Sequence, residues 1–324
     1  MNSLGRQIDY LRISVTGRCN ERCRYCRPPQ YAAWNSRADL LSEDELLRIV
    51  EVAAALGFRK FRLTGGEPLL RAGLVELVRA ISTTAGVDCI GISTNGLRLA
   101  SLAGPLRSAG ARTVNISLDA LNPAVYRRVT GGSVEPVLTG IRAALDAGFE
   151  FVKLNMVLMR GINEQEIWPM IRFSSEHEVP LRLIELMPLT ARGALTSANF
   201  IPVSEVIRWL QSREDLIPLP DPRLGHGPAK YYRLARSGAV VGFIGALSNP
   251  HFCATCNKMR LTADGRLRPC LGRHEEISLR DALADMNNEQ RLRRLFIQAV
   301  ANKPWEHAFR QGFIPGRPMT AIGG

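Results

Sequence analysis

The chain alternates regularly between strand-like and helix-like segments, and this alternation constrains the fold more than any other feature. Apolar, β-branched runs lie near residues 10–16, 61–64, 89–94, 113–118, 151–158 and 181–187, each followed by a helical or loop-plus-helix stretch. One such stretch, from Ser42 to Leu56, begins with a capping-box pattern. Successive βα units predict a parallel sheet, and right-handed crossovers curl it towards a barrel. We therefore expect the α/β class, with a partial (β/α)6 barrel of the TIM type.

Along these strands one face is polar and the other apolar. The polar positions are Arg12, Ser14 and Thr16, then Arg62 and Thr64, Ser93 and Asn95, Asn115, Ser117 and Asp119, and finally Lys153 and Asn155. If the apolar face packs on helices, the polar face lines the interior, where polar groups are costly without ligands or water. This predicts a polar cavity. A sheet with one solvated face is the alternative, although parallel sheets are usually covered on both sides.

Three cysteines follow the first strand at Cys19, Cys23 and Cys26. Iron–sulfur cubes normally take four thiolates, so a loop with three leaves one iron open to a small molecule. With Tyr25 before the last cysteine, the loop resembles the signature of the radical S-adenosylmethionine (SAM) enzymes. A zinc site or buried reduced thiols are the alternatives.

A second set, Cys253, Cys256 and Cys270, again offers three thiolates. Taken alone, a zinc site completed by His251 or His274 fits this spacing about as well. The loop at Cys19 favours a second cluster. The seventh cysteine, Cys89, lies in an apolar run, and we predict that it is a core residue.

The 324 residues provide enough chain for one large domain and one small domain. A region rich in proline and glycine follows residue 215, so we predict a radical-cluster domain over residues 1–220 and an α+β domain carrying the second cluster over 221–324. No signal-like or membrane-length apolar run occurs, which favours a cytoplasmic location.

The net charge of +12 favours an anionic partner. The basic residues are scattered without aromatic interleaving, so we expect a small anionic substrate rather than nucleic acid or a membrane. Lysine occurs only at positions 60, 153, 230, 258 and 303, which makes each lysine a candidate functional choice.

The motifs in order resemble those of the GTP 3′,8-cyclases, the radical SAM family that opens molybdenum-cofactor biosynthesis. The resemblance covers the strand at 10–16, the Cys19 loop, the segments 62–71, 93–96, 115–119 and 225–231, the second cysteine set and the end at 319–324. It implies 4Fe–4S clusters on Cys19, Cys23 and Cys26 and on Cys253, Cys256 and Cys270. It implies SAM contacts from Tyr25, Gly66, Ser117 and Met187, and a GTP site lined by Arg12, Arg62, Ser93, Lys153, Lys258, Met259 and Arg260.

The resemblance also implies a reaction. An electron from the first cluster cleaves SAM, the 5′-deoxyadenosyl radical removes the 3′ hydrogen of GTP, and the ribose carbon attacks C8 of guanine. The product is (8S)-3′,8-cyclo-7,8-dihydroguanosine 5′-triphosphate. Arg260 is the candidate catalytic residue, and either Arg260 or the region of the second cluster would contribute to quenching the product radical. A reductant such as flavodoxin or ferredoxin, a downstream cyclic pyranopterin monophosphate synthase and a possible homodimer are further implications.

Two rival functions stay open at this point, a radical SAM peptide maturase and a zinc-dependent nucleic-acid-binding protein. The chain departs from the family pattern at Gly17, Glu21 and Arg27. Ser93 replaces a threonine and keeps the hydroxyl, whereas Lys258 replaces an arginine and keeps the charge but loses the bidentate fork. The resemblance further implies that the terminal Gly323 and Gly324 form a tail that enters the active site.

Overall fold

The computed structural model describes residues 5–26, 40–189, 196, 198–220, 224, 227–285, 289–313 and 316–323. Within these residues a 12-stranded sheet runs in the order β12-β11-β10-β1-β2-β3-β4-β5-β6-β9-β8-β7. The strands are β1 (Tyr10–Ser14), β2 (Lys60–Thr64), β3 (Cys89–Thr94), β4 (Ala111–Ser117), β5 (Phe151–Leu158), β6 (Leu181–Glu185), β7 (Leu216–Pro218), β8 (Lys230–Leu234), β9 (Val240–Ile244), β10 (Lys258–Leu261), β11 (Arg266–Arg268) and β12 (Ile277–Ser278).

Helices follow the first strands as the alternation predicts. They are α1 (Glu43–Ala55), α2 (Leu74–Ser82), α3 (Leu99–Ser108), α4 (Pro123–Thr130), α5 (Glu135–Asp146), α6 (Ile167–Glu176), α7 (Val203–Gln211), α8 (Arg280–Ala284), α9 (Glu289–Ala301) and α10 (Met319–Ile322), with short 3-10 turns η2 (Pro68–Leu70), η3 (Glu164–Glu166) and η5 (Phe309–Gln311). The capping box is present, because Ser42 and Glu45 exchange hydrogen bonds of 2.7 and 3.1 Å between side chain and main chain.

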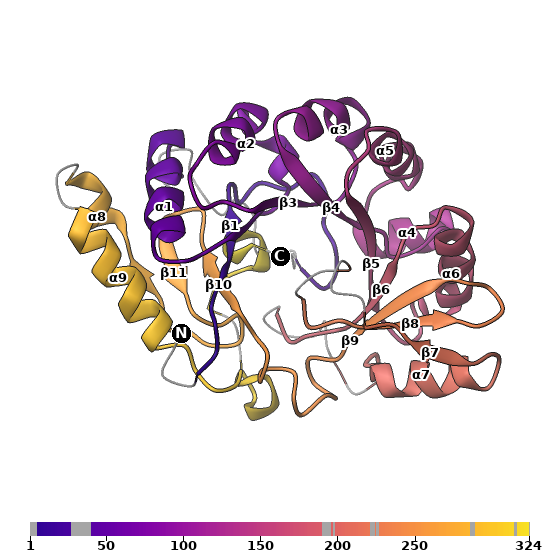
Figure 1. The fold of residues 1–324 in the computed structure, drawn as a ribbon. Coiled ribbons are helices and arrows are strands. Elements are labelled where there is room, and N and C mark those ends of the chain that lie inside the picture. Colours follow the sequence, from indigo (N-terminus) through magenta and orange to yellow (C-terminus); the bar gives the residue numbers. More distant parts are fainter. Residues whose placement is uncertain are drawn as a thin grey trace.

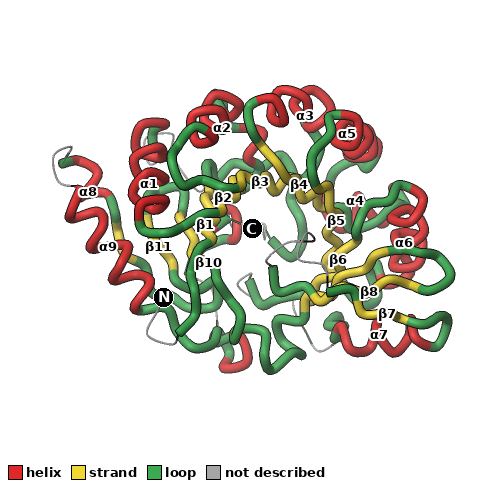
Figure 2. Tube along the Cα trace, viewed as in Figure 1, coloured by secondary structure: helices red, strands yellow, loops and turns green. Residues whose placement is uncertain are grey.

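The sheet curves into an open barrel with helices α1 to α6 on its convex side (Figure 1). β1 to β6 pair in parallel in sequence order, which confirms the six predicted βα units and the partial barrel. The tube in Figure 2 shows the same crescent of strands, with loops crossing its open side.

Strands from the C-terminal third extend this sheet at both edges. β10 pairs in parallel with β1, and β9 pairs in parallel with β6. Helix α9 packs beside α1, where the rings of Phe58 and Phe296 lie 5.9 Å apart edge to face. The boundary near residue 220 stays a prediction, and the strands on its two sides belong to one sheet.

The apolar residues of the barrel strands face outward into the main hydrophobic core. Leu11, Ile13, Leu63 and Val114 are fully buried there together with Ile49 of α1. This packing confirms that the polar positions point inward. In the described part of the chain, no helix combines the length and hydrophobicity needed to cross a membrane.

Candidate active site

The strand register places the predicted polar residues level with one another inside the barrel. Arg12 of β1 lies between Arg260 of β10 and Arg62 of β2. On the opposite wall, Asn115 of β4 lies between Ser93 and Lys153. Residues that are level on parallel strands point to the same side of the sheet. The barrel therefore gathers cations that lie far apart in the sequence.

Arg62 is fixed by bonds to three neighbouring strands. Its guanidinium donates to the Tyr10 hydroxyl, to the Ile92 carbonyl at 2.8 Å and to Thr113 Oγ1 at 2.9 Å. Gly91 makes this possible, because a Cβ there would lie 2.4 Å from Arg62 Nη2. Gly91 of β3 lies level with Arg62, and because it has no side chain it leaves room for the guanidinium. The sequence did not mark Gly91 as a site residue.

Burial and repulsion between neighbouring cations disfavour the charged forms of the interior arginines and lysine. Burial and the neighbouring Arg260 lower the pKa of Arg12 to about 9, and burial together with Arg182 and Arg62 lowers that of Lys153 to about 7. Burial likewise lowers the pKa of Arg260 to about 10. Clustered, desolvated cations of this kind favour an anion that restores charge balance.

Arg182 of β6 is an interior cation that the sequence analysis missed. Its Nε and Nη2 atoms are buried without a hydrogen-bond partner, and so is Oδ1 of Asn155, which lies level with it on β5. Buried polar atoms are nearly always paired in native proteins, so these atoms indicate space for a ligand. The alternation along residues 181–187 could have identified Arg182, since it occupies a polar position between Leu181 and Leu183.

The first cysteine loop follows β1 at the edge of this interior. Cys19, Cys23 and Cys26 are all half-buried thiols outside any disulfide. Burial raises the pKa of Cys23 well above its usual value, and Glu21 and the other two thiols raise it further. The three sulfurs therefore lie close enough to interact. Thiolates become favourable at such a site once iron supplies the positive charge.

Two tyrosines anchor this loop to the barrel. The Tyr25 hydroxyl donates to Asp119 Oδ2 at 2.7 Å, and the Tyr126 hydroxyl of α4 donates to Glu21 Oε1 at 2.6 Å. Burial raises the pKa of Glu21 to about 7 and that of Asp119 to about 6. Glu21, a departure from the family pattern, thus makes a buried structural contact.

Gly65 and Gly66 allow the end of β2 to approach the start of the cysteine loop. A Cβ on Gly65 would lie 2.3 Å from the Thr16 carbonyl, and one on Gly66 would lie 2.2 Å from the Arg18 carbonyl. The Gly66 amide donates to the Thr16 carbonyl at 2.7 Å. Glycine is therefore required at these two positions because the main chain after β2 lies against the main chain at the start of the cysteine loop.

The second cysteine set lies around a buried lysine. Lys303 donates to the Lys258 and Pro269 carbonyls, both at 2.7 Å. Burial raises the pKa of Cys256, but the Lys303 and Lys258 charges outweigh that effect and lower it. For Cys253 and Cys270, burial leaves the pKa raised. Lys303, which sequence reasoning noted only for the rarity of lysine, is thus a positively charged support for the Cys256 thiolate.

The residues fit the groups that the cysteine spacing implies. Among the described residues, no three His, Cys, Asp or Glu side chains are gathered as ligands of a single metal ion, and this holds for the two cysteine sets as well. The zinc alternative invoked His251 or His274; both are exposed, and the ring of His274 packs 4.7 Å from that of Phe313. Each trio of thiols has the donor chemistry for a 4Fe–4S cluster with one open iron.

The C-terminal tail reaches this interior. Figure 1 shows the C-terminal end on the concave side of the sheet, and the Gly323 carbonyl accepts a hydrogen bond from Arg260 Nη1. A Cβ at Gly323 would lie 2.9 Å from Thr64 Cγ2. The tail therefore passes close to β1 and β2. Gly324, Arg27, Gly225 and His226 lie outside the described residues.

The remaining predicted residues differ in where their side chains point. Ser117 ends β4, level with Asn155, and Lys258 lies on the inner side of β10, with its Nζ 5.2 Å from the Tyr10 ring centroid. Met187 packs against the small apolar cluster of Leu189, Phe309 and Phe313. Met259 is fully buried in the hydrophobic core, so only its main chain can face the interior. Cys89 is half-buried rather than a core residue.

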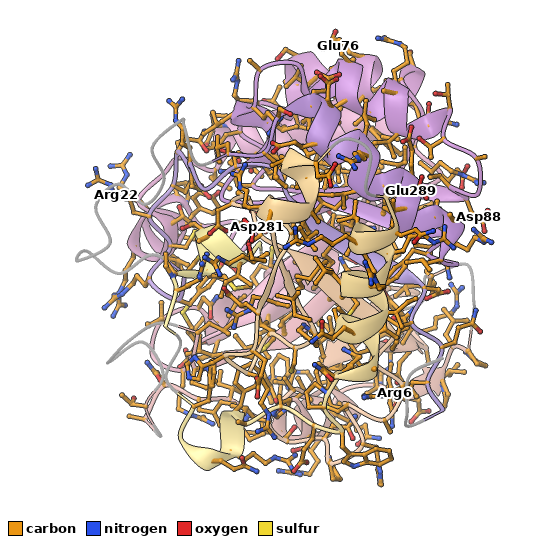
Figure 3. The ribbon with its side chains drawn as sticks, turned by 90° about the vertical axis from the view of Figure 1, so that its left-hand side faces the viewer. Arg6, Arg22, Glu76, Asp88, Asp281 and Glu289 are labelled. Carbon is orange, nitrogen blue, oxygen red and sulfur yellow. The ribbon has the colours of Figure 1, made fainter. Side chains whose placement is uncertain are left out.

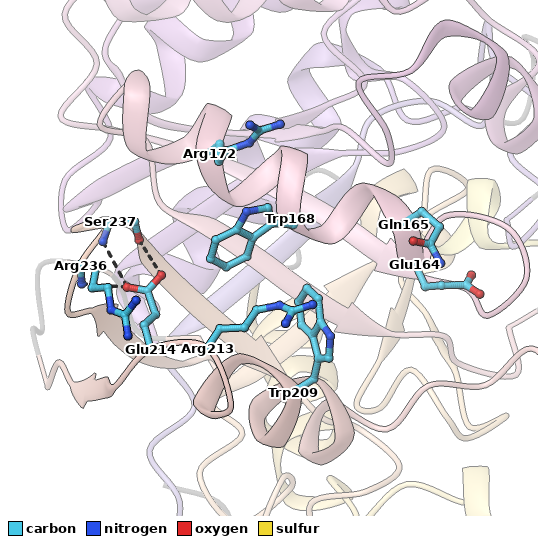
Figure 4. A pocket seen from close by; sticks show the side chains of 9 residues that line it. All are labelled: Glu164, Gln165, Trp168, Arg172, Trp209, Arg213, Glu214, Arg236 and Ser237. Carbon is cyan, nitrogen blue, oxygen red and sulfur yellow. Dashed lines mark hydrogen bonds between the residues drawn. The ribbon is translucent and has the colours of Figure 1, made fainter.

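A separate cavity of about 690 Å³ lies on the outside of the barrel between α6 and α7 (Figure 4). The rings of Trp168 and Trp209 meet edge to face there at 6.1 Å, and Arg213 lies 4.3 Å above Trp209. None of the predicted site residues lines this cavity. The chemistry proposed below therefore belongs to the barrel interior.

Comparisons with known proteins identify the family of the chain. The chain matches the Radical SAM superfamily over residues 13–174 and Molybdenum Cofactor Synthesis C over residues 179–309. It is 42% identical to a GTP 3′,8-cyclase of Desulforamulus reducens, covering 100% of both chains, and 43% identical to one of Moorella thermoacetica, covering 98% of both. Streptococcus suis SuiB bound to S-adenosylmethionine shares the fold, with a TM-score of 0.62, 14% identity, and coverage of 91% of this chain and 68% of SuiB. The chain belongs to the radical SAM superfamily and, within it, to the GTP 3′,8-cyclase family.

Proposed function

We propose that the protein converts GTP to (8S)-3′,8-cyclo-7,8-dihydroguanosine 5′-triphosphate, the first step of molybdenum-cofactor biosynthesis. Its relatives at about 40% identity over their full length carry the name GTP 3′,8-cyclase. The observation that carries the proposal within this chain is the row of inward cations on β10, β1 and β2, with Lys153 and Arg182 opposite. A triphosphate matches this concentration of positive charge.

The cofactors of the proposal are SAM and two 4Fe–4S clusters. When bound, they supply the one-electron chemistry that removes a hydrogen atom from the ribose of GTP. Cys19, Cys23 and Cys26 would hold the first cluster, and Cys253, Cys256 and Cys270 the second. Tyr25, Gly66, Ser117 and Met187 are the proposed SAM contacts, with Met187 the least directly placed because it packs on an apolar cluster.

The protein's own contribution is position and charge. Arg12, Arg62, Lys153 and Arg182 would bind the triphosphate, because charge-assisted hydrogen bonds strengthen in a desolvated site. Ser93 lies level with Asn115 and Lys153 and offers a hydroxyl to the same region. The guanine end would be held beside the second cysteine set by Lys258, Arg260 and the main chain of Met259. Fixing both ends of GTP orients the ribose for reaction.

Arg260 is the proposed catalytic residue. It lies between the second cysteine set and the Gly323 carbonyl, and Cys256 and Cys270 favour its charged form. A fixed cation at this position would stabilise negative charge that develops on the guanine ring and hold the tail in place.

The decisive experiment is turnover under anaerobic conditions. The reconstituted protein with dithionite, SAM and GTP is expected to yield 5′-deoxyadenosine and the cyclised nucleotide, with about eight iron atoms per chain. Cys19→Ala should lose both products because one ligand of the first cluster is missing. Cys89→Ala, a thiol outside both sets, should retain the iron. Product formation by Cys19→Ala would refute the assignment.

A further inference from the structure

The first cysteine loop carries exposed arginines between its cysteines. Arg18, Arg22 and Arg24 alternate with Cys19, Cys23 and Cys26, and all three arginine side chains are exposed. Figure 3 shows Arg22 projecting from the edge of the molecule, away from the ribbon. The surface directly over the first cysteine set is therefore strongly positive.

Helix α4 adds two more arginines to this surface. The amides of Arg22 and Arg24 donate to the carbonyls of Thr130 and Val129 at 2.9 and 3.0 Å, so the loop lies along the end of α4. Arg127 and Arg128 in that last turn are exposed. We call Arg18, Arg22, Arg24, Arg127 and Arg128 the loop-face arginines.

The loop-face arginines belong to those surface arginines that no neighbouring carboxylate neutralises in the described part of the chain. Several others pair with carboxylates, for example Arg112 with Glu150 at 2.5 Å and Arg160 with Glu205 at 2.7 Å. Within the described residues, no ion pair of a loop-face arginine occurs. The nearby carboxylates of Glu21 and Asp119 are buried and bonded to tyrosines. The positive charge thus remains available to a partner.

We propose that the loop-face arginines are the docking surface for an acidic one-electron donor protein. The inference rests on the proposed function, in which each SAM cleavage consumes one electron from outside the chain. In that step the donor is oxidised by one electron and the first cluster is reduced by one, with no other bond made or broken. Cys19, Cys23 and Cys26 are only half-buried and alternate with the exposed Arg18, Arg22 and Arg24, so a donor bound on this face would lie next to the proposed cluster ligands.

Charge complementarity favours an acidic protein as the partner of the loop-face arginines. An acidic donor protein is steered to an exposed positive surface, and such steering raises association rates by about 10- to 1,000-fold at low ionic strength. GTP itself would be attracted to the same charges, but the interior already provides its cations. Faster GTP capture and RNA binding are therefore the rival outcomes that the test must separate.

The test uses an acidic plant-type ferredoxin as the donor. The variant is Arg22→Gln/Arg127→Gln/Arg128→Gln, which leaves Arg18 and Arg24 beside the cysteines untouched. The matched control is Arg79→Gln/Arg142→Gln/Arg172→Gln, which removes the same charge from exposed positions on α2, α5 and α6. The main measurements are the initial rate of 5′-deoxyadenosine formation against ferredoxin concentration and the binding of oxidised ferredoxin by calorimetry. The rate with dithionite, the affinities for GTP and RNA, and the iron content are measured alongside.

The variant is expected to lose about tenfold in its ferredoxin-dependent rate and in ferredoxin affinity at low salt. The difference should vanish at about 1 M salt, where the screening length is about 3 Å. Its rate with dithionite, its GTP affinity and its iron content should match those of the control. Equal ferredoxin rates in the two proteins would overturn the docking surface, as would an effect confined to GTP or RNA binding. Failure of turnover with dithionite in the unmodified protein would instead refute the proposed function.

Discussion

Lys153 is the interior cation whose charge responds most directly to pH. It is 5% exposed, and its pKa of about 7 results from burial and from the neighbouring charges of Arg182 and Arg62. As the pH rises through 7, the empty site therefore loses one positive charge. The scarcity of lysine and the polar alternation of β5 marked this residue from the sequence. Its shifted pKa depends on neighbours that come from other strands.

We predict that the affinity for GTP falls as the pH rises above about 7, because the charged form of Lys153 binds the triphosphate. The dissociation constant is measured from about pH 6 to about pH 9 for the unmodified protein, Lys153→Met and Lys153→Arg. Lys153→Met should bind more weakly with a flatter profile, and Lys153→Arg should keep its affinity at high pH. The ionisation of GTP itself is common to all three. Parallel profiles for the unmodified protein and Lys153→Met would contradict the prediction.

Arg182→Met should weaken GTP binding by at least about tenfold, because hydrogen bonds to charged groups contribute about 1.5–3 kcal/mol. The two buried guanidinium nitrogens without partners are the reason to expect a direct contact. Anaerobic equilibrium dialysis measures the affinity. Arg142→Met, on the exposed side of α5, is the matched control. Identical affinities for the two variants would remove Arg182 from the site.

At the scale of single elements, the residues of one strand determine where the side chains of nearby strands can extend. β3 contributes Gly91 so that Arg62 of β2 can reach Thr113 of β4. The cysteine loop likewise depends on α4, which supplies the Tyr126 hydroxyl and two main-chain carbonyls. Sequence patterns predicted each of these elements separately. They did not predict these contacts, since register across strands is set only when the sheet forms.

Gly91→Ala is expected to displace the Arg62 guanidinium, since the new Cβ would lie 2.4 Å from Nη2. GTP affinity should fall several-fold, and the melting temperature should decrease because overpacking costs about 1–3 kcal/mol. Gly104→Ala in α3 is the control, because nothing lies within 4 Å of its built Cβ. Because Gly104 precedes Pro105 within the helix, where a Cβ is disfavoured, no stabilisation is expected and the change serves as the control for GTP affinity. Thermal unfolding and GTP binding are measured for both variants, and unchanged GTP binding in Gly91→Ala would contradict the role assigned to this glycine.

At the scale of the whole molecule, the C-terminal third completes the site. β10 brings Lys258 and Arg260 beside Arg12, and a charged network fixes the segment that enters the barrel. Arg317 donates to both oxygens of Asp264 at 2.9 and 3.0 Å and lies 3.2 Å from Glu276. This network lies just before α10 and Gly323. It therefore holds the tail against Arg260.

Arg317→Met should release the C-terminal tail, because two partly buried carboxylates lose their partner. Hydrogen exchange of residues 316–323 is expected to accelerate at least about tenfold if a single charged hydrogen bond of about 1.5–3 kcal/mol is lost. Arg160→Met, which loses an ion pair with Glu205 that shares no residue with this network, is the control. Equal exchange in the two variants would show that the tail is held by other contacts.

The sequence alone determined the βα alternation, the polar inner face and both cysteine trios, because each is a local pattern of spacing or period. It also supported the family assignment and most of the interior cations. Only the tertiary structure decided that β9 and β10 join opposite edges of the β1–β6 sheet, that Arg182 lies among the interior cations, that Lys303 lies beside the second cysteine set, and that Met259 is buried in the hydrophobic core. These features depend on pairing between residues far apart in the chain, which no local pattern specifies.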